Sequence, residues 1–94
     1  MTTLADLDTL PGAGLVQRGV ADLDARHESA AALLVSIGAP RLRRLGVDLP
    51  TPITSPEHKL YEFLAQEKGD GAHSAYNALN RRLVSFERAA ACAN

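Results

Sequence analysis

The residues with the clearest capacity for chemistry in this 94-residue sequence are arginines in two clusters. Arg41, Arg43 and Arg44 form the denser cluster, and Arg81 and Arg82 form the second. Guanidinium groups bind carboxylates and phosphates through paired hydrogen bonds, so each cluster is a candidate contact for an anion or a partner protein. If the two clusters meet in space, they form one anion-binding patch.

A helix–turn–helix outline is the sharpest form of a nucleic-acid hypothesis for the first cluster. An apolar helix, a turn at Gly38 and a short arginine-bearing helix follow one another. The second helix would end at Gly46, however, and so would be too short to lie in a major groove. Arg44 also stands where such a motif needs an apolar side chain. A solvated face, or pairing with the acidic N-terminal segment, is therefore favoured over specific reading of DNA, and contact with an anionic partner protein ranks between them.

The histidines and their polar neighbours do not form a convincing catalytic or metal-binding set. His58 and Glu62 are four residues apart and share a helix face, but His73 would lie at the far end of a helical hairpin. Ser74 directly follows His73, and adjacent residues on a helix do not face each other. The sequence therefore predicts no enzyme activity, no metal site and no cofactor.

Composition and charge narrow the classes of protein further. Hydrophobic residues make up 46% of the chain and charged residues 22%, which is ordinary for a globular protein and argues against disorder. The net charge is −1, so no overall field draws the chain to nucleic acid or to an anionic membrane. The single cysteine, Cys92, cannot form an internal disulfide. With neither a signal peptide nor a membrane-spanning run in sight, we expect a cytoplasmic protein with no membrane partner.

The elements that position these residues are predicted to be helices. Apolar residues recur at helical spacing over most of the chain, and no stretch alternates long enough for a strand. We predict an all-α fold, a small helical bundle whose four main helices cover residues 15–26, 30–37, 56–68 and 71–91. Ser29 and Ser55 are suitable N-caps for the second and third helices. Gly19 weakens the first helix, and the close approach of another helix would explain its presence.

A short helix is predicted between the second and third main helices. Gly38 suits the position just past the end of the second helix, and Pro40 fits the first turn of a new one. The new helix, over 41–45, would end at Gly46.

An extended strap containing two prolines follows, over residues 47–55. Proline disfavours helix at its own position and at the residue before it. We expect the strap to pack on the domain through Leu49 and Ile53, which would otherwise be exposed. A single domain is predicted over 1–94, with a weak helix at 3–9 and with ends, 1–10 and 92–94, that are free to fray.

The last predicted helix has the most regular pattern in the chain. We call its apolar positions the seam: Ala72, Tyr76, Leu79, Leu83, Phe86 and Ala90, at alternating spacings of four and three. This spacing is typical of a helix that packs on a neighbour at a shallow angle. The link before it is very short, so the 56–68 helix is predicted to be its antiparallel neighbour.

Charge segregation bears on what the fold does. Residues 1–28 and 55–70 are net acidic, and residues 29–54 and 71–94 are net basic. Such blocks can pair within a fold or between two copies. We therefore expect a non-enzymatic helical interaction or regulatory module that binds a protein partner or itself, with a homo-oligomer favoured. The alternative is a nucleic-acid-associated protein that uses both arginine clusters.

Overall fold

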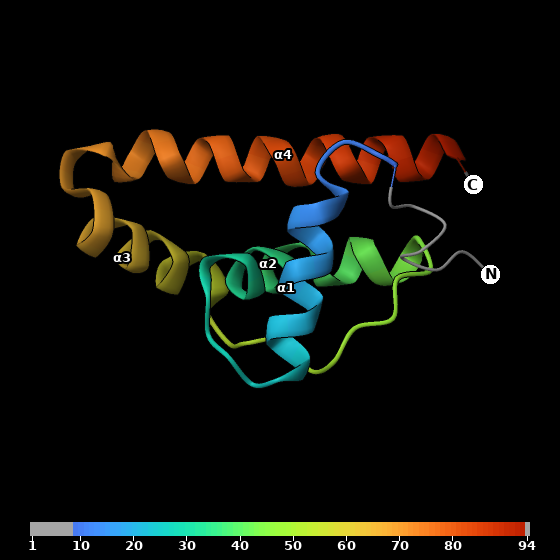
Figure 1. Ribbon diagram of the computed structural model, residues 1–94, viewed down its shortest axis with the longest axis horizontal. Helices are drawn as coiled ribbons and strands as arrows, with labels where there is room; N and C mark the ends of the chain where they lie inside the picture. Colours follow the sequence, from blue (N-terminus) through green and yellow to red (C-terminus); the bar gives the residue numbers. More distant parts are fainter. Residues whose placement is uncertain (1–8, 94) are drawn as a thin grey trace.

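The computed structural model describes residues 9–93. These residues form four α-helices, whose arrangement is shown in Figure 1. They are α1 (Ala13–Asp24), α2 (Ala30–Arg44), α3 (Pro56–Lys68) and α4 (Ala72–Ala93), with a short 3-10 turn, η2 (Gly69–Gly71), between the last two. The described residues contain no strand, so the predicted all-α class is confirmed. Apart from residue 9, the weak helix predicted at 3–9 falls outside the described residues.

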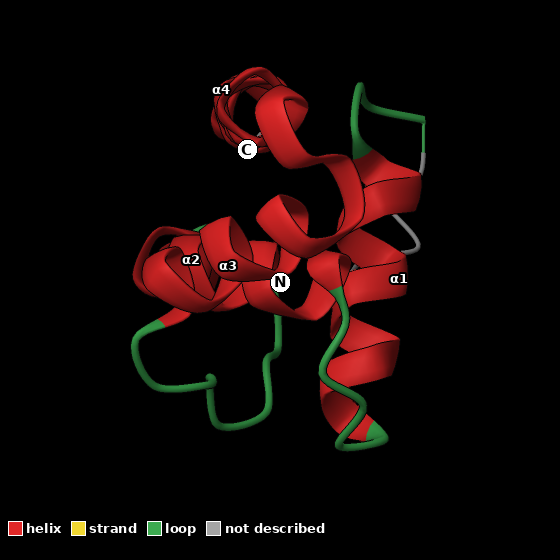
Figure 2. Cartoon of the chain, turned by 90° about the vertical axis from the view of Figure 1, so that its left-hand side faces the viewer, coloured by secondary structure: helices red, strands yellow, loops and turns green. Residues whose placement is uncertain are grey.

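The helices are arranged around α2. α4 runs along the long axis of a molecule that measures 40 × 24 × 18 Å, and α2 lies beside it (Figure 1). α3 turns back through η2 to form a hairpin with the first half of α4, and α1 crosses α2 on another side (Figure 2). α2 contacts each of the other three α-helices, so the core is centred on it.

α2 contributes the largest part of the core because nearly all of its first three turns are buried. Its buried residues are Ala31, Ala32, Leu33, Leu34, Val35, Ser36, Gly38, Ala39 and Leu42. A small residue on α1 allows it to come close to α2. A Cβ atom at Gly19 of α1 would lie 2.6 Å from Val35 Cγ1, which leaves no room for a side chain. The close helix approach expected at Gly19 is therefore confirmed.

α2 is also longer than predicted. The separate helices expected over 30–37 and 41–45 are one helix, and both Gly38 and Pro40 lie inside it. An interior proline lacks one backbone hydrogen bond and costs about 3 kcal/mol. Pro40 is exposed, whereas Ala39 and Leu42 are 1% and 0% exposed. Burial of these two side chains keeps the chain helical past the proline, so tertiary packing overrides the local stop signals.

The two serines predicted as N-caps behave differently. Ser29 Oγ accepts a hydrogen bond from the Ala32 N–H at 3.1 Å and donates one to Asp22 Oδ2 at 2.7 Å. It therefore caps α2 as predicted and ties the end of α1 to it. The side chain of Ser55 makes no capping hydrogen bond, and its φ is 50°. The prediction of a capping role for Ser55 was wrong, because its backbone is left-handed at this position rather than extended.

Side chains of α2 hold the long link between α2 and α3. Leu49 is buried, and the Ile53 N–H donates a hydrogen bond to Ser36 Oγ at 3.1 Å. Arg43 Nη2 donates to the Pro50 carbonyl oxygen, also at 3.1 Å. The link thus lies against the helix that precedes it.

The seam of α4 faces the core. Ala72, Leu83, Phe86 and Ala90 are at most 2% exposed, and Tyr76 and Leu79 are half-buried against them. The predicted face of this helix is therefore the one that packs. One charged residue beside the seam, Glu87, is only 8% exposed, and the sequence did not predict its burial.

Candidate functional site

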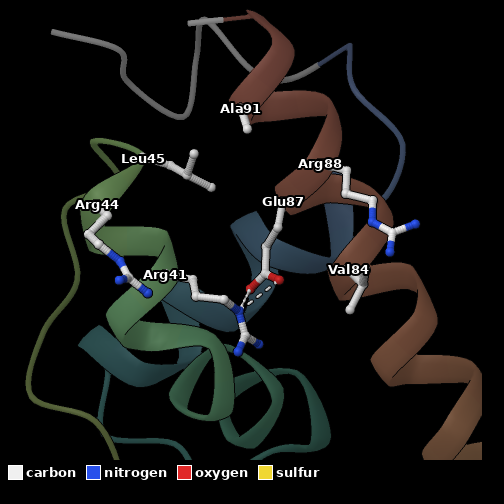
Figure 3. A pocket seen from close by; sticks show the side chains of 7 residues that line it. All are labelled: Arg41, Arg44, Leu45, Val84, Glu87, Arg88 and Ala91. Atoms are coloured by element: carbon white, nitrogen blue, oxygen red, sulfur yellow. Dashed lines mark hydrogen bonds and ion pairs between the residues drawn. The ribbon is translucent and has the colours of Figure 1, made fainter.

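A groove of about 510 Å³ lies between the C-terminal halves of α2 and α4. The end of α2 contributes Arg41, Arg44 and Leu45, and α4 contributes Val84, Glu87, Arg88 and Ala91 (Figure 3). Its lining is mostly apolar surface with arginines around it. These two helices are far apart in sequence, so only the folded chain assembles the groove.

An ion pair across the groove joins its two walls. Arg41 Nε donates to Glu87 Oε1 and to Glu87 Oε2, each at 3.0 Å (Figure 3). The Glu87 side chain is 10% exposed, and that of Arg41 is 49% exposed. A buried carboxylate is costly unless a cation and hydrogen bonds compensate for its lost hydration. Arg41 therefore neutralises Glu87 from the solvent side and fixes the spacing of the two helices.

The sequence makes room for this carboxylate by placing a glycine opposite it. A Cβ atom at Gly38 would lie 2.9 Å from Glu87 Oε2 and 3.0 Å from Leu83 Cδ2. A side chain at this position would therefore force the ends of the Glu87 and Leu83 side chains to shift. Gly38 was predicted to end a helix, but here it allows two helices to approach.

Two further arginines stand on opposite sides of the groove. Arg44 extends from α2 toward Arg41, and the Arg88 guanidinium lies near Val84 on the side away from Arg41 (Figure 3). Both are exposed, and within residues 9–93 neither forms a hydrogen bond or an ion pair. Because Arg41 already neutralises Glu87, these two arginines leave the groove with a positive charge.

The groove also exposes apolar surface. Val84 is 36% exposed and is one of two large hydrophobic side chains exposed in the described part of the chain. Leu45 and Ala91 line the groove beyond Glu87, at the end away from Val84 (Figure 3). A partner could therefore bury apolar atoms here while it pairs with the arginines.

The first predicted arginine cluster is divided by the fold. Arg41 and Arg44 line the groove, but Arg43 is directed to the opposite side of α2, where it donates to the Pro50 carbonyl. Residues next to each other on a helix differ in direction by about 100°, so three neighbouring arginines cannot share a face.

The second cluster lies on α4, outside the groove, and its two arginines line hollows elsewhere on this helix. Arg81 lies on the exposed face of α4 with Val84 and Arg88, along a hollow next to the groove. Arg82 lies farther round, beside Arg81 and Gly12 in the turn before α1. The two predicted clusters thus do not merge, and Arg88 is the arginine of α4 that joins Arg41 and Arg44.

Glu87 and Arg88 were not among the predicted site residues. Glu87 follows Leu83 by four residues, so it flanks the seam at a position that packs against a neighbouring helix. This position is the sequence signal for its burial. Nothing in the sequence indicates that Arg41 is its partner, because that depends on how α2 and α4 cross.

The other polar groups considered in the sequence lie apart from the groove. His58 Nε2 and Glu62 Oε1 are 2.7 Å apart on the exposed surface of α3. His73 packs edge-on to the Tyr61 ring, with the two ring centres 6.5 Å apart. Among residues 9–93, no three histidine, cysteine or acidic side chains lie together as metal ligands would. Cys92 is exposed near the end of α4.

Comparisons with protein-family models, with curated proteins and with solved structures found no match to this chain. Every helix in the described part of the chain is too short or too polar to cross a membrane. The case for a function therefore depends on the groove itself.

Proposed function

We propose that this chain is a non-enzymatic helical interaction module that binds a protein partner in the groove between α2 and α4. The observation that carries the proposal is the exposure of Val84 between Arg44 and Arg88, two arginines without a partner in residues 9–93. Protein interfaces are enriched in arginine and in apolar contacts at their centre. A groove with both features is better suited to a protein than to solvent.

The construction of the groove supports the same proposal. Both walls are helices, and the pair of Arg41 and Glu87 sets their spacing. A site built on rigid elements loses little conformational entropy when a partner binds. The groove is also open to solvent rather than enclosed, which suits a segment of polypeptide better than a small molecule.

Self-association is the second part of the proposal. Support comes from the segregated charge blocks and from an acidic hollow between α1 and the link that follows α2. That hollow is lined by Asp24 and Asp48 together with apolar atoms of Val20 and Leu49. Its charge is opposite to that of the groove. Two copies in contact through unlike surfaces would therefore attract each other.

Sedimentation velocity across a wide range of protein concentration tests self-association. We expect the mean sedimentation coefficient to rise with concentration, and to rise less when salt screens the charges. A species that stays monomeric at every concentration would remove self-association from the proposal. Binding of a different protein in the groove would then be the part left to test.

Nucleic-acid association is a second candidate, because Arg41, Arg44 and Arg88 line one groove and Arg81 lies next to it. The apolar lining favours a protein instead. Fluorescence anisotropy with labelled duplex DNA and single-stranded RNA tests this candidate. Binding that weakens steeply with salt and is lost with Arg44→Ala and Arg88→Ala would support it. No retention of either probe at low salt would eliminate it.

We also propose a cytoplasmic location. It is supported by the single cysteine, Cys92, which lies exposed near the end of α4 and has no second cysteine in the chain to pair with. Proteins of oxidising compartments commonly carry disulfides, whereas exposed free thiols persist where glutathione keeps them reduced.

A further inference from the structure

We propose that the groove binds an acidic segment of a partner protein, in which an apolar side chain is flanked by carboxylates. This inference rests on the proposed function and specifies the chemistry of the partner. It follows from three properties of the groove: the charge that remains after its internal ion pair is formed, the apolar surface between the arginines, and the fixed spacing of its walls.

The remaining charge determines the sign of the partner. Both carboxylate oxygens of Glu87 accept from Arg41 Nε, so the charge of this acid is already compensated within the groove. Arg44 and Arg88 have no partner in residues 9–93. A carboxylate matches the planar fork of a guanidinium and forms charge-assisted hydrogen bonds with it.

The apolar surface determines what else the segment must carry. Val84 lies between the guanidinium groups, with Ala91 and Leu45 farther along the groove (Figure 3). A purely acidic chain would leave this surface in contact with water. A leucine or similar side chain between two carboxylates would cover Val84 and exclude water from the flanking ion pairs, which strengthens them.

The same charges argue against two other occupants. A second copy that presented its own groove would bring arginines against arginines, which is repulsive. Nucleic acid would gain from the arginines but would leave Val84 uncovered. An acidic, partly apolar segment uses every exposed group of the groove.

The experiment uses the full 94-residue chain and a synthetic helix-forming peptide whose leucines recur at spacings of four and three between glutamates. The matched control peptide carries glutamine at each glutamate position. Isothermal titration calorimetry at low and at moderate salt measures both affinities. We expect the acidic peptide to bind and the glutamine peptide to bind about tenfold more weakly, since each exposed ion pair contributes modestly. Added salt should weaken only the acidic peptide.

Two pairs of variants localise the binding. The double variant Arg44→Ala and Arg88→Ala should weaken the acidic peptide about tenfold, whereas Arg18→Ala on exposed α1 surface should not. Val84→Asp should also weaken it, through the lost apolar contact and the added like charge. Ser74→Asp adds the same charge to exposed α4 surface away from the groove and is its control. Circular dichroism melting curves check that each variant folds.

The outcomes separate this inference from the function on which it rests. Equal affinity for the two peptides, or no effect of the double arginine variant, would overturn the acidic partner. Displacement of the peptide by duplex DNA with a steeper salt dependence would overturn it in favour of nucleic acid. If no peptide binds but the chain self-associates in a manner that Val84→Asp abolishes, the partner class is wrong and the interaction function stands. If neither peptide binding nor self-association is seen, both are wrong.

Discussion

Arg41 Nε lies 3.0 Å from each carboxylate oxygen of Glu87, although the two residues are 46 positions apart in the sequence. This contact joins the last turns of α2 to α4 and forms the inner surface of the groove. Its two partners differ in burial, at 49% and 10% side-chain exposure. Removal of Arg41 and neutralisation of Glu87 should therefore change the free energy of unfolding by different amounts.

Removal of Arg41 should destabilise the fold more than neutralisation of Glu87. Arg41→Ala leaves a buried carboxylate without its cation, which we expect to cost about 1–3 kcal/mol in the free energy of unfolding. Glu87→Gln keeps the shape and removes the charge, so it should cost less. The double variant should be more stable than the sum of the two losses predicts. Urea unfolding of the four proteins measures this coupling, and strict additivity would mean that the pair contributes nothing.

Gly38→Ala should destabilise the protein although alanine is the better helix former. A Cβ atom there would lie 2.9 Å from Glu87 Oε2 and 3.0 Å from Leu83 Cδ2, so we expect a loss of about 1–3 kcal/mol. Gly14→Ala in α1 is the matched control, because no atom lies within 4 Å of its Cβ position. That variant should gain about 0.5 kcal/mol. A stabilising Gly38→Ala in thermal melts would show that the Glu87 and Leu83 side chains shift to admit the methyl group at little cost.

Leu83→Ala should cost about 2–5 kcal/mol, because Leu83 is 1% exposed in the middle of the seam. Arg81→Ala, two residues earlier on the exposed face of the same helix, should change stability by less than about 0.5 kcal/mol. Chemical denaturation of the two variants tests the orientation of α4. Similar losses for both would contradict the assigned face.

The two serines that precede helices should respond oppositely to substitution. Ser29→Ala removes the cap on Ala32 N–H and the bond to Asp22, and should cost about 1–2 kcal/mol. Ser55→Gly removes no capping bond and relieves a left-handed backbone, so it should gain up to about 1 kcal/mol. Melting temperatures measured under one set of conditions would show this. A destabilised Ser55→Gly would mean that the hydroxyl has a role in solution.

The local sequence predicted a helix correctly where its apolar spacing or its capping residue was not opposed by a stop signal. The spacing of the seam identified the buried face of α4, and Ser29 marked the start of α2. At Gly38 and Pro40 the local signals indicate a stop, but the burial of Ala39 and Leu42 keeps the helix intact. That energy comes from residues distant in sequence, so no local pattern could reveal it.

The candidate site was predictable only in part, for a geometric reason. Arg41 and Arg44 were identified because arginine is abundant there, but Arg43 was grouped with them although it points to the link at Pro50. Glu87 was passed over because a lone acid among arginines resembles a surface residue. Its burial depends on the space at Gly38, which exists only once α2 and α4 have packed.

The space at Gly38 constrains how this sequence can vary. A side chain at position 38 and a long carboxylate at position 87 compete for the same volume. In a library that randomises both positions, substitutions at Gly38 should therefore survive only together with a smaller residue at position 87. These variants would lack the Glu87 carboxylate, so Arg41 would have no ion-pair partner across the groove. Selection for folding alone would therefore change the charge of the groove. The two positions are expected to vary as a pair, a linkage that sequencing of the selected library would detect.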